Sequence, residues 1–309
     1  MDVRSLVALT LTACAVTPTR TSTSTVTPTP APTVTPTSTV TPTVTPTPTP
    51  TLTPTPPTAA PPSCPPSDGF DMGRSLDRRD TRHRVVLTHG FCMDANEVTA
   101  GDFARCVTEK KCAEPWRGDP WSSYGRFPDQ PVNMVSWVGA HAYCEWASKR
   151  LPTEAEWEWA ASGPGGTKWP WGDTPDPSCD SVDYTMQGAP KWAPGGDFGC
   201  GGGGPSPVGT HPKGDKVWPQ GKLHDLAGNV WEWVEDSFDS YPADSQTDPL
   251  VRRESALHAI RGGGWNRPAT ALTTYARAAA HYEYRVPALG FRCARGEAHP
   301  TPPPRQKRP

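Results

Sequence analysis

The chain has 309 residues, a formal net charge of −2 and no block of basic residues, which argues against a nucleic-acid-binding protein. No run of about 18 apolar residues occurs, so the sequence contains no ordinary transmembrane helix. Its 40 prolines lie mostly at the two ends, whereas the 13 tryptophans and 28 glycines fall almost entirely in the middle. This distribution predicts extended ends around a middle domain that is rich in turns and has enough aromatic surface to build a core.

Residues 1–13 have the pattern of a secretory signal peptide, because the basic residue Arg4 precedes a short apolar stretch that ends in small residues. The ending Leu11-Thr12-Ala13-Cys14 resembles the lipobox of bacterial lipoproteins, in which the cysteine becomes the lipidated first residue of the mature protein. The sequence therefore predicts an exported protein, anchored through Cys14 in a bacterial cell envelope, on its periplasmic face or on the cell surface. An ordinary signal peptide without a lipid anchor is the alternative.

Residues 14–63 consist mainly of Thr-Pro repeats. Because proline fixes an extended backbone and the repeats offer little apolar surface to bury, this segment is predicted to be a disordered, semi-rigid stalk. Residues 297–309 are rich in proline and basic side chains and are predicted to be a disordered tail. The folded domain is expected between these segments, at residues 64–296.

The domain is expected to begin with two short strands, at 84–87 and 90–94, because β-branched and aromatic residues flank a turn there. A helix should follow, with Thr99 as its N-cap and Asp102 at the reciprocal position. The run 131–135 has the composition of a strand that leads into a second helix.

Ser136 is the expected N-cap of this second helix, whose small and apolar residues recur at every third or fourth position and form one buried face. Those residues are Trp137, Ala140, Cys144 and Ala147. A third helix should start after Pro152, because Thr153 and Glu156 have the spacing of a capping box.

After the third helix, about fifty residues lack regular patterning, and a loop of that length usually has a function, a metal or disulfides to order it. Short strands are expected again near the end of the domain, around 260–265 and 289–294, where glycines mark tight turns or close backbone approach. Few helices, many short strands and long loops predict an α+β domain.

The chain has nine cysteines, and with Cys14 set aside for lipidation an even number remains in an exported protein, which favours disulfides over a metal site or a catalytic thiol. Loop closure predicts two pairs, the joining of the first and last strands suggests a third, and elimination leaves a fourth. In that order, the pairs are Cys106–Cys112, Cys179–Cys200, Cys92–Cys293 and Cys64–Cys144.

The segment 224–233 combines two tryptophans, two acids and a Gly-Asn turn signal. In an extended segment alternate residues share a face, so positions 228, 230 and 232 can point the same way. Two backbone carbonyls and the Glu232 carboxylate, with Asp225 reaching back, would form an oxygen-rich pocket that suits Ca²⁺. From these residues alone, the alternative is a surface turn followed by a core strand with two structural tryptophans.

Seven motifs occur in order within the domain. They lie at 91–99, 131–133, 150–160, 169–172, 228–233, 261–263 and 290–292. As a set they resemble the formylglycine-generating enzyme family, also called the sulfatase-modifying factor domain, over most of residues 85–295. The resemblance implies a fold that is related to C-type lectins, low in regular secondary structure and held by calcium.

The resemblance also implies which residues bind calcium. One ion would be held by the Asp225 side chain, the Gly228 and Val230 carbonyls and the Glu232 carboxylate. A second ion would lie in the long loop, at four further positions whose alternative is ordinary solvated loop carboxylates. Those positions are Asp180, the Ser181 carbonyl, Asp197 and the Gly199 carbonyl.

The enzymes of this family oxidise a substrate cysteine to formylglycine with copper held by two active-site cysteines, and a pair of thiolates suits Cu(I). In these enzymes the first cysteine lies six residues after the arginine of the Arg-Gly-Gly motif and the second lies five further on. Here those positions hold Arg267 and Leu272. Neither side chain replaces a thiolate, so no copper is expected.

The sequence therefore predicts a calcium-stabilised, non-catalytic binding or accessory domain, monomeric, whose partner is an envelope protein or a glycan. It would contact the membrane only through its lipid anchor. The alternative is an enzyme of the family, which either generates formylglycine with relocated cysteines or has a divergent oxidoreductase or maturation activity.

Overall fold

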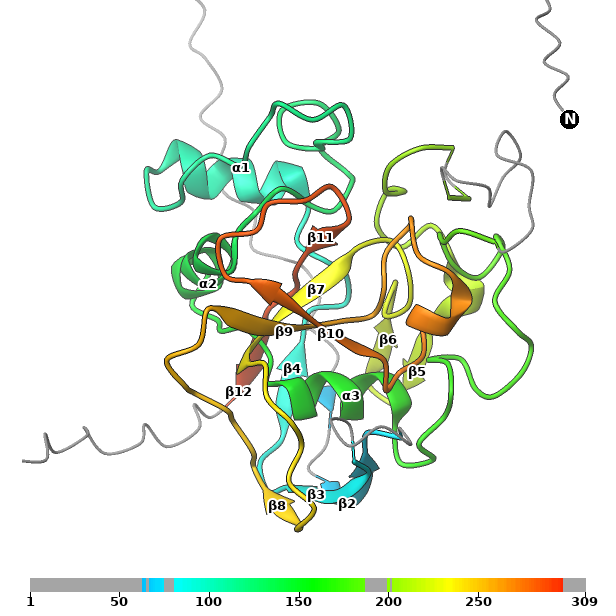
Figure 1. Ribbon diagram of the computed structural model, residues 1–309. Coiled ribbons are helices and arrows are strands. Elements are labelled where there is room, and N and C mark those ends of the chain that lie inside the picture. Colours follow the sequence, from blue (N-terminus) through cyan, green and yellow to red (C-terminus); the bar gives the residue numbers. More distant parts are fainter. Residues whose placement is uncertain (1–62, 65–66, 75–80, 187–198, 201, 297–309) are drawn as a thin grey trace, which may run out of the picture. The chain divides into compact units, whose positions relative to one another are not determined.

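The computed structural model describes residues 63–64, 67–74, 81–186, 199–200 and 202–296 (Figure 1). The predicted signal peptide, Cys14, the predicted tail and all but the last residue of the predicted stalk lie outside the described residues, as does Asp197. Within the described part, no helix is both long and apolar enough to cross a membrane.

The first two helices start where their caps predict. Helix α1 spans Ala100–Thr108, and its N-cap Thr99 accepts a hydrogen bond from the Asp102 amide. Helix α2 spans Trp137–Trp146, and the Ser136 side chain accepts one from the Gly139 amide. In each case a short polar side chain satisfies a backbone donor that the first helical turn leaves unpaired.

Helix α3 spans Glu154–Ser162 and starts with the predicted capping box, in which Thr153 and Glu156 exchange side-chain and backbone hydrogen bonds. All nine of its residues are buried, three glutamates included. A helix that is buried on every side needs partners for its charges, because an unpaired charge in the interior is costly. Two arginines of the neighbouring sheet, Arg277 and Arg261, pair with Glu154 and Glu158, and Arg150 just before the helix pairs with Glu156.

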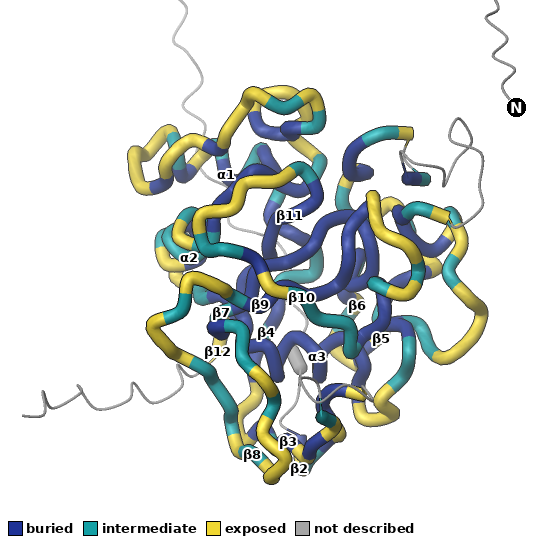
Figure 2. Tube along the Cα trace, viewed as in Figure 1, coloured by how far each residue is buried: buried dark blue, intermediate teal, exposed yellow. Residues whose placement is uncertain are grey.

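That sheet has four strands in the order β10-β9-β7-β11. Their bounds are Arg277–His281 for β10, Leu257–Arg261 for β9, Trp231–Ser237 for β7 and Leu289–Gly290 for β11. The β7–β11 pair is parallel and the other pairs are antiparallel. One face packs on α3, where Arg261 is ion-paired with Glu158, and the other packs on α2 and the chain before it, where the Trp233 indole donates to the Val135 carbonyl. The strands β7 and β9 and helix α3 form the buried centre of the domain (Figure 2).

Three smaller sheets surround this centre. They are β1 (Ser63–Cys64) with β4 (Phe91–Met93) and β12 (Ala294–Gly296), β2 (Ser67–Met72) with β3 (His83–Leu87) and β8 (Gln246–Thr247), and β5 (Lys216–Trp218) with β6 (Gly221–Leu223). In the first of these sheets β4 lies between β1 and β12, so the first and last strands of the domain belong to one sheet. The α+β prediction, with little regular structure, is confirmed.

The predicted strand at 131–135 was wrong. This run is irregular and forms only an isolated bridge between Thr99 and Pro131. Met134 adopts a φ of 58°, which lies in the left-handed region and cannot continue an extended strand. The apolar residues of the run are nevertheless buried, so the hydrophobic pattern reflected burial and not strand geometry.

Two of the expected disulfides, Cys106–Cys112 and Cys179–Cys200, are present. The expected pair Cys92–Cys293 was wrong, because Cys293 is bonded to Cys144 of α2 with a Cα–Cα distance of 5.7 Å. The register of β4 and β12 places Arg295 opposite Cys92, so Cys293 is not its cross-strand neighbour. Cys92 is a free thiol, and the bond to Cys144 also excludes the pair expected by elimination.

Candidate binding groove and calcium site

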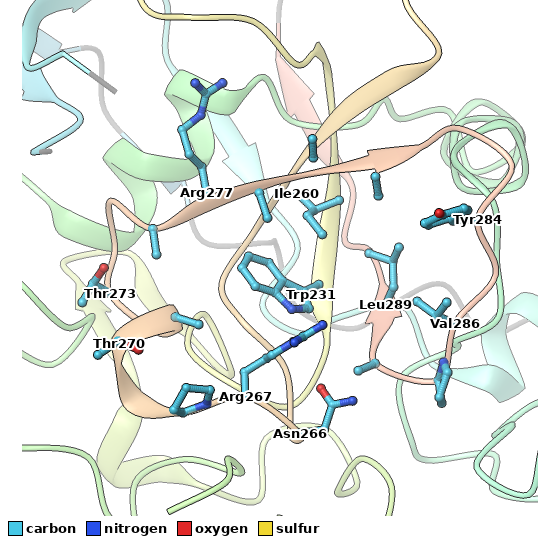
Figure 3. A pocket seen from close by; sticks show the side chains of 18 of the residues that line it. Trp231, Ile260, Asn266, Arg267, Thr270, Thr273, Arg277, Tyr284, Val286 and Leu289 are labelled. Carbon is cyan, nitrogen blue, oxygen red and sulfur yellow. The ribbon is translucent and has the colours of Figure 1, made fainter. Parts of the chain in front are cut away.

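A groove of about 940 Å³ lies on the α2 face of the four-stranded sheet, over the part of that face that α2 does not cover (Figure 3). Every strand contributes to its floor, with Trp231 from β7, Ile260 from β9, Leu289 from β11 and the small side chains of Ala278 and Ala280 from β10. The floor belongs to the larger core cluster, so the groove is the point at which that core reaches solvent. Its size is that of a site for a small molecule or a peptide side chain.

Two segments form the walls of the groove. The segment 266–276 forms one wall and contributes Arg267, Thr270 and Thr273, and the segment 284–288 forms the other. Tyr284 and Val286 stand at the rim with 56% and 39% of their surface exposed. In Figure 3, Arg267 extends beneath Trp231, at the end of the groove away from β10.

The described lining of the groove contains no cysteine, histidine or carboxylate. Arg277 is among its residues but points away from it, toward α3 (Figure 3). Its guanidinium donates two hydrogen bonds of 2.7 Å to the Glu154 carboxylate and lies 4.3 Å from the ring centre of Phe238 and 4.0 Å from that of Tyr241. The groove therefore has an apolar floor and one available charge, that of Arg267. It can bind a ligand, and its described lining contains none of the histidine or carboxylate side chains that most often serve as a general base.

The resemblance implies copper-binding cysteines at positions 267 and 272, and the side chains at these two positions lie in different parts of the domain. Arg267 is exposed and lines the groove. Leu272 is fully buried and packs in a separate apolar cluster with Trp169, Val182 and Tyr184. A copper site needs two soft ligands at one point, so the residues present do not fit this metal.

Glu232, one of the predicted calcium ligands, is fully buried in an ion pair. Arg292 donates to both of its carboxylate oxygens at 2.8 Å, and the Trp157 indole donates at 2.9 Å. One of the two oxygens thus accepts two hydrogen bonds and the other accepts one, which leaves the second oxygen a free lone pair. Glu232 can contribute at most a single oxygen to a cation.

Asp225 lies close to Glu232 but has separate partners. It is buried, it has a left-handed φ of 54°, and its carboxylate accepts a hydrogen bond of 2.6 Å from the Gly209 amide. The Asn96 side-chain oxygen is buried without a hydrogen-bond partner and lies against the same glycine. An orphaned buried oxygen beside a buried carboxylate is the arrangement that a hard cation would satisfy.

The sequence prediction missed Glu97 and Asn229, which lie at the centre of this region. The Asn229 amide donates to the Glu97 carboxylate at 2.9 Å, and the Val230 N–H donates to it at 3.4 Å. Burial, followed by the negative charge of Asp225, holds the pKa of Glu97 well above its usual value. Glu97, Asp225 and Glu232 thus face a single buried guanidinium, that of Arg292. Glu97 and Asn229 both lie in the family motifs, but neither spacing nor composition distinguishes them from solvated polar residues.

Of the second predicted calcium set, the structure describes Asp180, Ser181 and Gly199, whereas Asp197 lies outside the described residues. Asp180 has a side chain that is 72% exposed and is ion-paired with Lys213, while the Ser181 carbonyl lies against Gly214. The buried acid of this loop is Asp183, which accepts a hydrogen bond from Ser206 and lies next to Gly199. Among the described residues, no three histidine, cysteine or acidic side chains are grouped closely enough to hold a metal ion.

The sequence of the domain also matches a known protein family. Residues 66–297 match the sulfatase-modifying factor enzyme 1-like domain. The chain belongs to this family. It is 38% identical over 177 residues to the formylglycine-generating enzyme of Streptomyces coelicolor, a match that covers 54% of this chain and 53% of that enzyme. The corresponding enzyme of Mus musculus is 31% identical over 258 residues, which cover 68% of this chain and 67% of that protein.

A further relative is the inactive C-alpha-formylglycine-generating enzyme 2 of Bos taurus, which is 37% identical over 190 residues, 60% of this chain and 57% of that protein. The chain thus spans little more than half the length of several curated relatives it matches. Among solved structures, PvdO from Pseudomonas aeruginosa superposes with a TM-score of 0.58 at 24% identity, over 75% of this chain and 92% of that one. Treponema denticola variable protein 1 gives 0.57 at 22%, over 76% and 94%. These two likenesses establish a shared fold.

Proposed function

We propose that this chain is a non-catalytic binding domain of the family, stabilised by calcium, exported and lipid-anchored, whose groove on the four-stranded sheet receives a segment of a partner protein. The observation that carries the proposal is the replacement of the family's two cysteines by Arg267, which lines the groove, and Leu272, which is buried away from it. That one relative is named inactive shows that members of this family without activity exist.

The groove favours a protein segment over a glycan. Its floor is formed by Trp231, Ile260, Leu289 and alanines, which offer apolar surface and few hydrogen-bonding groups. A sugar needs many such groups, because each hydroxyl that loses water without a new partner costs free energy. The charge of Arg267 at one end selects a segment that carries a carboxylate, since a guanidinium forms strong, directional hydrogen bonds with that group.

The alternative is enzymatic activity, which is favoured by the 38% identity to a formylglycine-generating enzyme. The purified protein would be incubated with Cu(I) and a cysteine-containing sulfatase-type peptide, and the peptide mass would be followed. The Streptomyces coelicolor enzyme serves as the positive control. We expect no conversion by this chain, and oxidation of the peptide cysteine would overturn the non-catalytic proposal.

Ligand selection by the groove can be measured with a labelled apolar heptapeptide that contains one glutamate and with its glutamine twin, by fluorescence anisotropy. The glutamate peptide should bind more tightly, and Arg267→Gln should remove the difference. Ala278→Trp, which fills the floor, should weaken both peptides. Arg252→Gln, at a half-exposed arginine outside the groove, is the matched control. Equal binding of the two peptides by the unaltered protein would refute a role for Arg267.

Calcium is supported by the orphaned Asn96 oxygen and by the three buried carboxyl groups that face one guanidinium. A calcium ion bound to Asp225 would offset the negative charge of these three acids, and the Gly228 and Val230 carbonyls would also coordinate it. Chelation should lower the melting temperature, and Asp225→Asn should abolish that difference, because it removes the charge but keeps an acceptor for the Gly209 amide. Asp180→Asn, at the exposed acid, should retain it. A melting curve that chelation leaves unchanged would remove calcium from the proposal.

Export and anchoring rest on the residues before the domain and on its three disulfides, because such bonds persist in oxidising compartments. Cys14→Ala should release the protein from the membrane fraction of an expressing bacterium without changing its fold. Membrane association that survives the substitution would exclude this anchor.

A further inference from the structure

A second cavity, of about 440 Å³, lies on the α3 side of the sheet, between the start of α3, strand β3 and the segment 236–253. We propose that this cavity binds a small organic cation with a primary ammonium group, and that the Asp236 carboxylate is its counter-ion. Asp236 is the third buried acid of this region, after Glu154 and Glu158, and it plays no part in the groove or the calcium site.

Among the described residues around the cavity, one acid has no basic partner. Glu154 is paired with Arg277 through two hydrogen bonds of 2.7 Å, and Asp239 is paired with Arg253 at 2.8 Å. Behind the wall, Arg261 is paired with Glu158. None of these three arginines forms an ion pair with Asp236.

The partners of Asp236 are two backbone amides. Its carboxylate accepts hydrogen bonds of 2.8 Å from the Glu154 N–H, at the start of α3, and from the Val251 N–H. These bonds hold the carboxylate in one orientation at the cavity wall, and each oxygen retains a lone pair for a ligand. Burial, followed by the charge of Glu154, raises the pKa of Asp236 to about 7, and no basic side chain of the described residues offsets this rise.

The remaining lining is neutral and suits a short alkyl chain. Met72, Leu250 and Pro249 provide apolar surface. His83 also lines the cavity, and because burial lowers its pKa the ring is mainly neutral near pH 7 and does not repel a cation. The volume lies in the range of small-ligand sites. An ammonium group at Asp236 with an alkyl chain along these side chains would satisfy both parts of the cavity.

The probe for this site is n-butylammonium, with n-butanol as its neutral analogue, and binding to the full chain is followed by NMR chemical shifts. The amine should bind and the alcohol should not. Asp236→Asn should weaken amine binding about tenfold or more, since it removes a charge-assisted hydrogen bond. Asp176→Asn, at an acid whose side chain is 86% exposed, is the control. The melting temperature of each variant shows whether it remains folded.

The pH dependence gives a second readout. An alkylammonium stays protonated below about pH 9, as a lysine does. Affinity should therefore rise roughly tenfold from pH 6 to pH 8, because the ionised fraction of an acid with a pKa of about 7 rises by that factor. Asp236→Asn should abolish this rise, whereas His83→Gln should keep it.

Two outcomes would overturn the proposal. One is equal binding of the amine and the alcohol, or binding of neither, which would mean that the cavity holds only water. The other is an amine affinity that Asp236→Asn leaves unchanged, which would move the site elsewhere. Because Arg267 lies outside this cavity, Arg267→Gln should not affect amine binding, so failure here is independent of the proposed groove function.

Discussion

The disulfide between Cys144 and Cys293 should be the largest covalent contribution to the stability of the domain. It joins α2 to the chain just before β12 and spans a sequence separation of 149 residues. We predict that Cys144→Ala destabilises the protein far more than Cys106→Ala, which removes a disulfide with a separation of six. Cys92→Ala, at the free thiol, should have the smallest effect.

The magnitude follows from the entropy that a cross-link removes from the unfolded chain. The chain-entropy model gives about 5 kcal/mol for a loop as long as that closed by Cys144 and Cys293 and about 2 kcal/mol for the short loop. Both cysteines of the long loop are fully buried, so their loss also disturbs packing. The total approaches the free energy of unfolding of an ordinary domain, roughly 5–15 kcal/mol.

The assay is denaturant unfolding of the three variants, combined with a count of reactive thiols in the unfolded protein. Cys144→Ala should add one thiol, that of Cys293, relative to the unaltered chain. If Cys92→Ala instead proved as destabilising as Cys144→Ala, and Cys144→Ala exposed no new thiol, the pairing and the reasoning built on it would be refuted.

Three further outcomes follow from buried groups. Glu154→Gln should cost about 3–5 kcal/mol in urea unfolding, because it removes the buried carboxylate charge that pairs with the Arg277 guanidinium and lies 3.6 Å from that of Arg261; a cost below about 1 kcal/mol would contradict this. The folded-state pKa of Asp236 is raised above its unfolded value to about 7, so the native state binds the extra proton and this group's contribution to stability falls as pH rises from 4 to 7. Asp236→Asn should flatten that fall in melting temperature. Gly228→Ala should unfold at a clearly lower temperature than Gly166→Ala, because both have a positive φ but only the first would place a Cβ within 2.3 Å of a backbone oxygen.

The local elements of the fold were predictable because their signals are local. Thr99, Ser136 and the Thr153–Glu156 pair lie within one helical turn of the donors they satisfy, so spacing alone located three helix starts. The strand predicted at 131–135 was wrong because its signal is not specific to strands. Its apolar pattern indicates burial, which a strand and an irregular buried segment share, and the left-handed Met134 has no sequence signal.

The predicted site residues are those that lie close together in one short segment. Asp225 and Glu232 came from the pattern of residues 224–233 and from the resemblance, but the ion pair of Glu232 with Arg292 joins residues 60 apart in the chain. The orphaned Asn96 oxygen and the buried Asp183 depend on which loop covers them. No periodicity or spacing in the sequence carries that information.

By itself, the sequence determined the class of the domain, its helix starts, two of its disulfides and the presence of Arg267 and Leu272 where the resemblance implies two cysteines. Each of these depends on residue identity or on neighbours a few positions apart. Only the tertiary structure decided that Cys144 bonds to Cys293, that Arg267 lines a groove while Leu272 is buried elsewhere, and that Asp236 has no basic partner in the part of the chain that the structure describes. Those outcomes depend on the packing of distant strands and loops around α3 and the four-stranded sheet, where burial and charge are set by elements far apart in the chain.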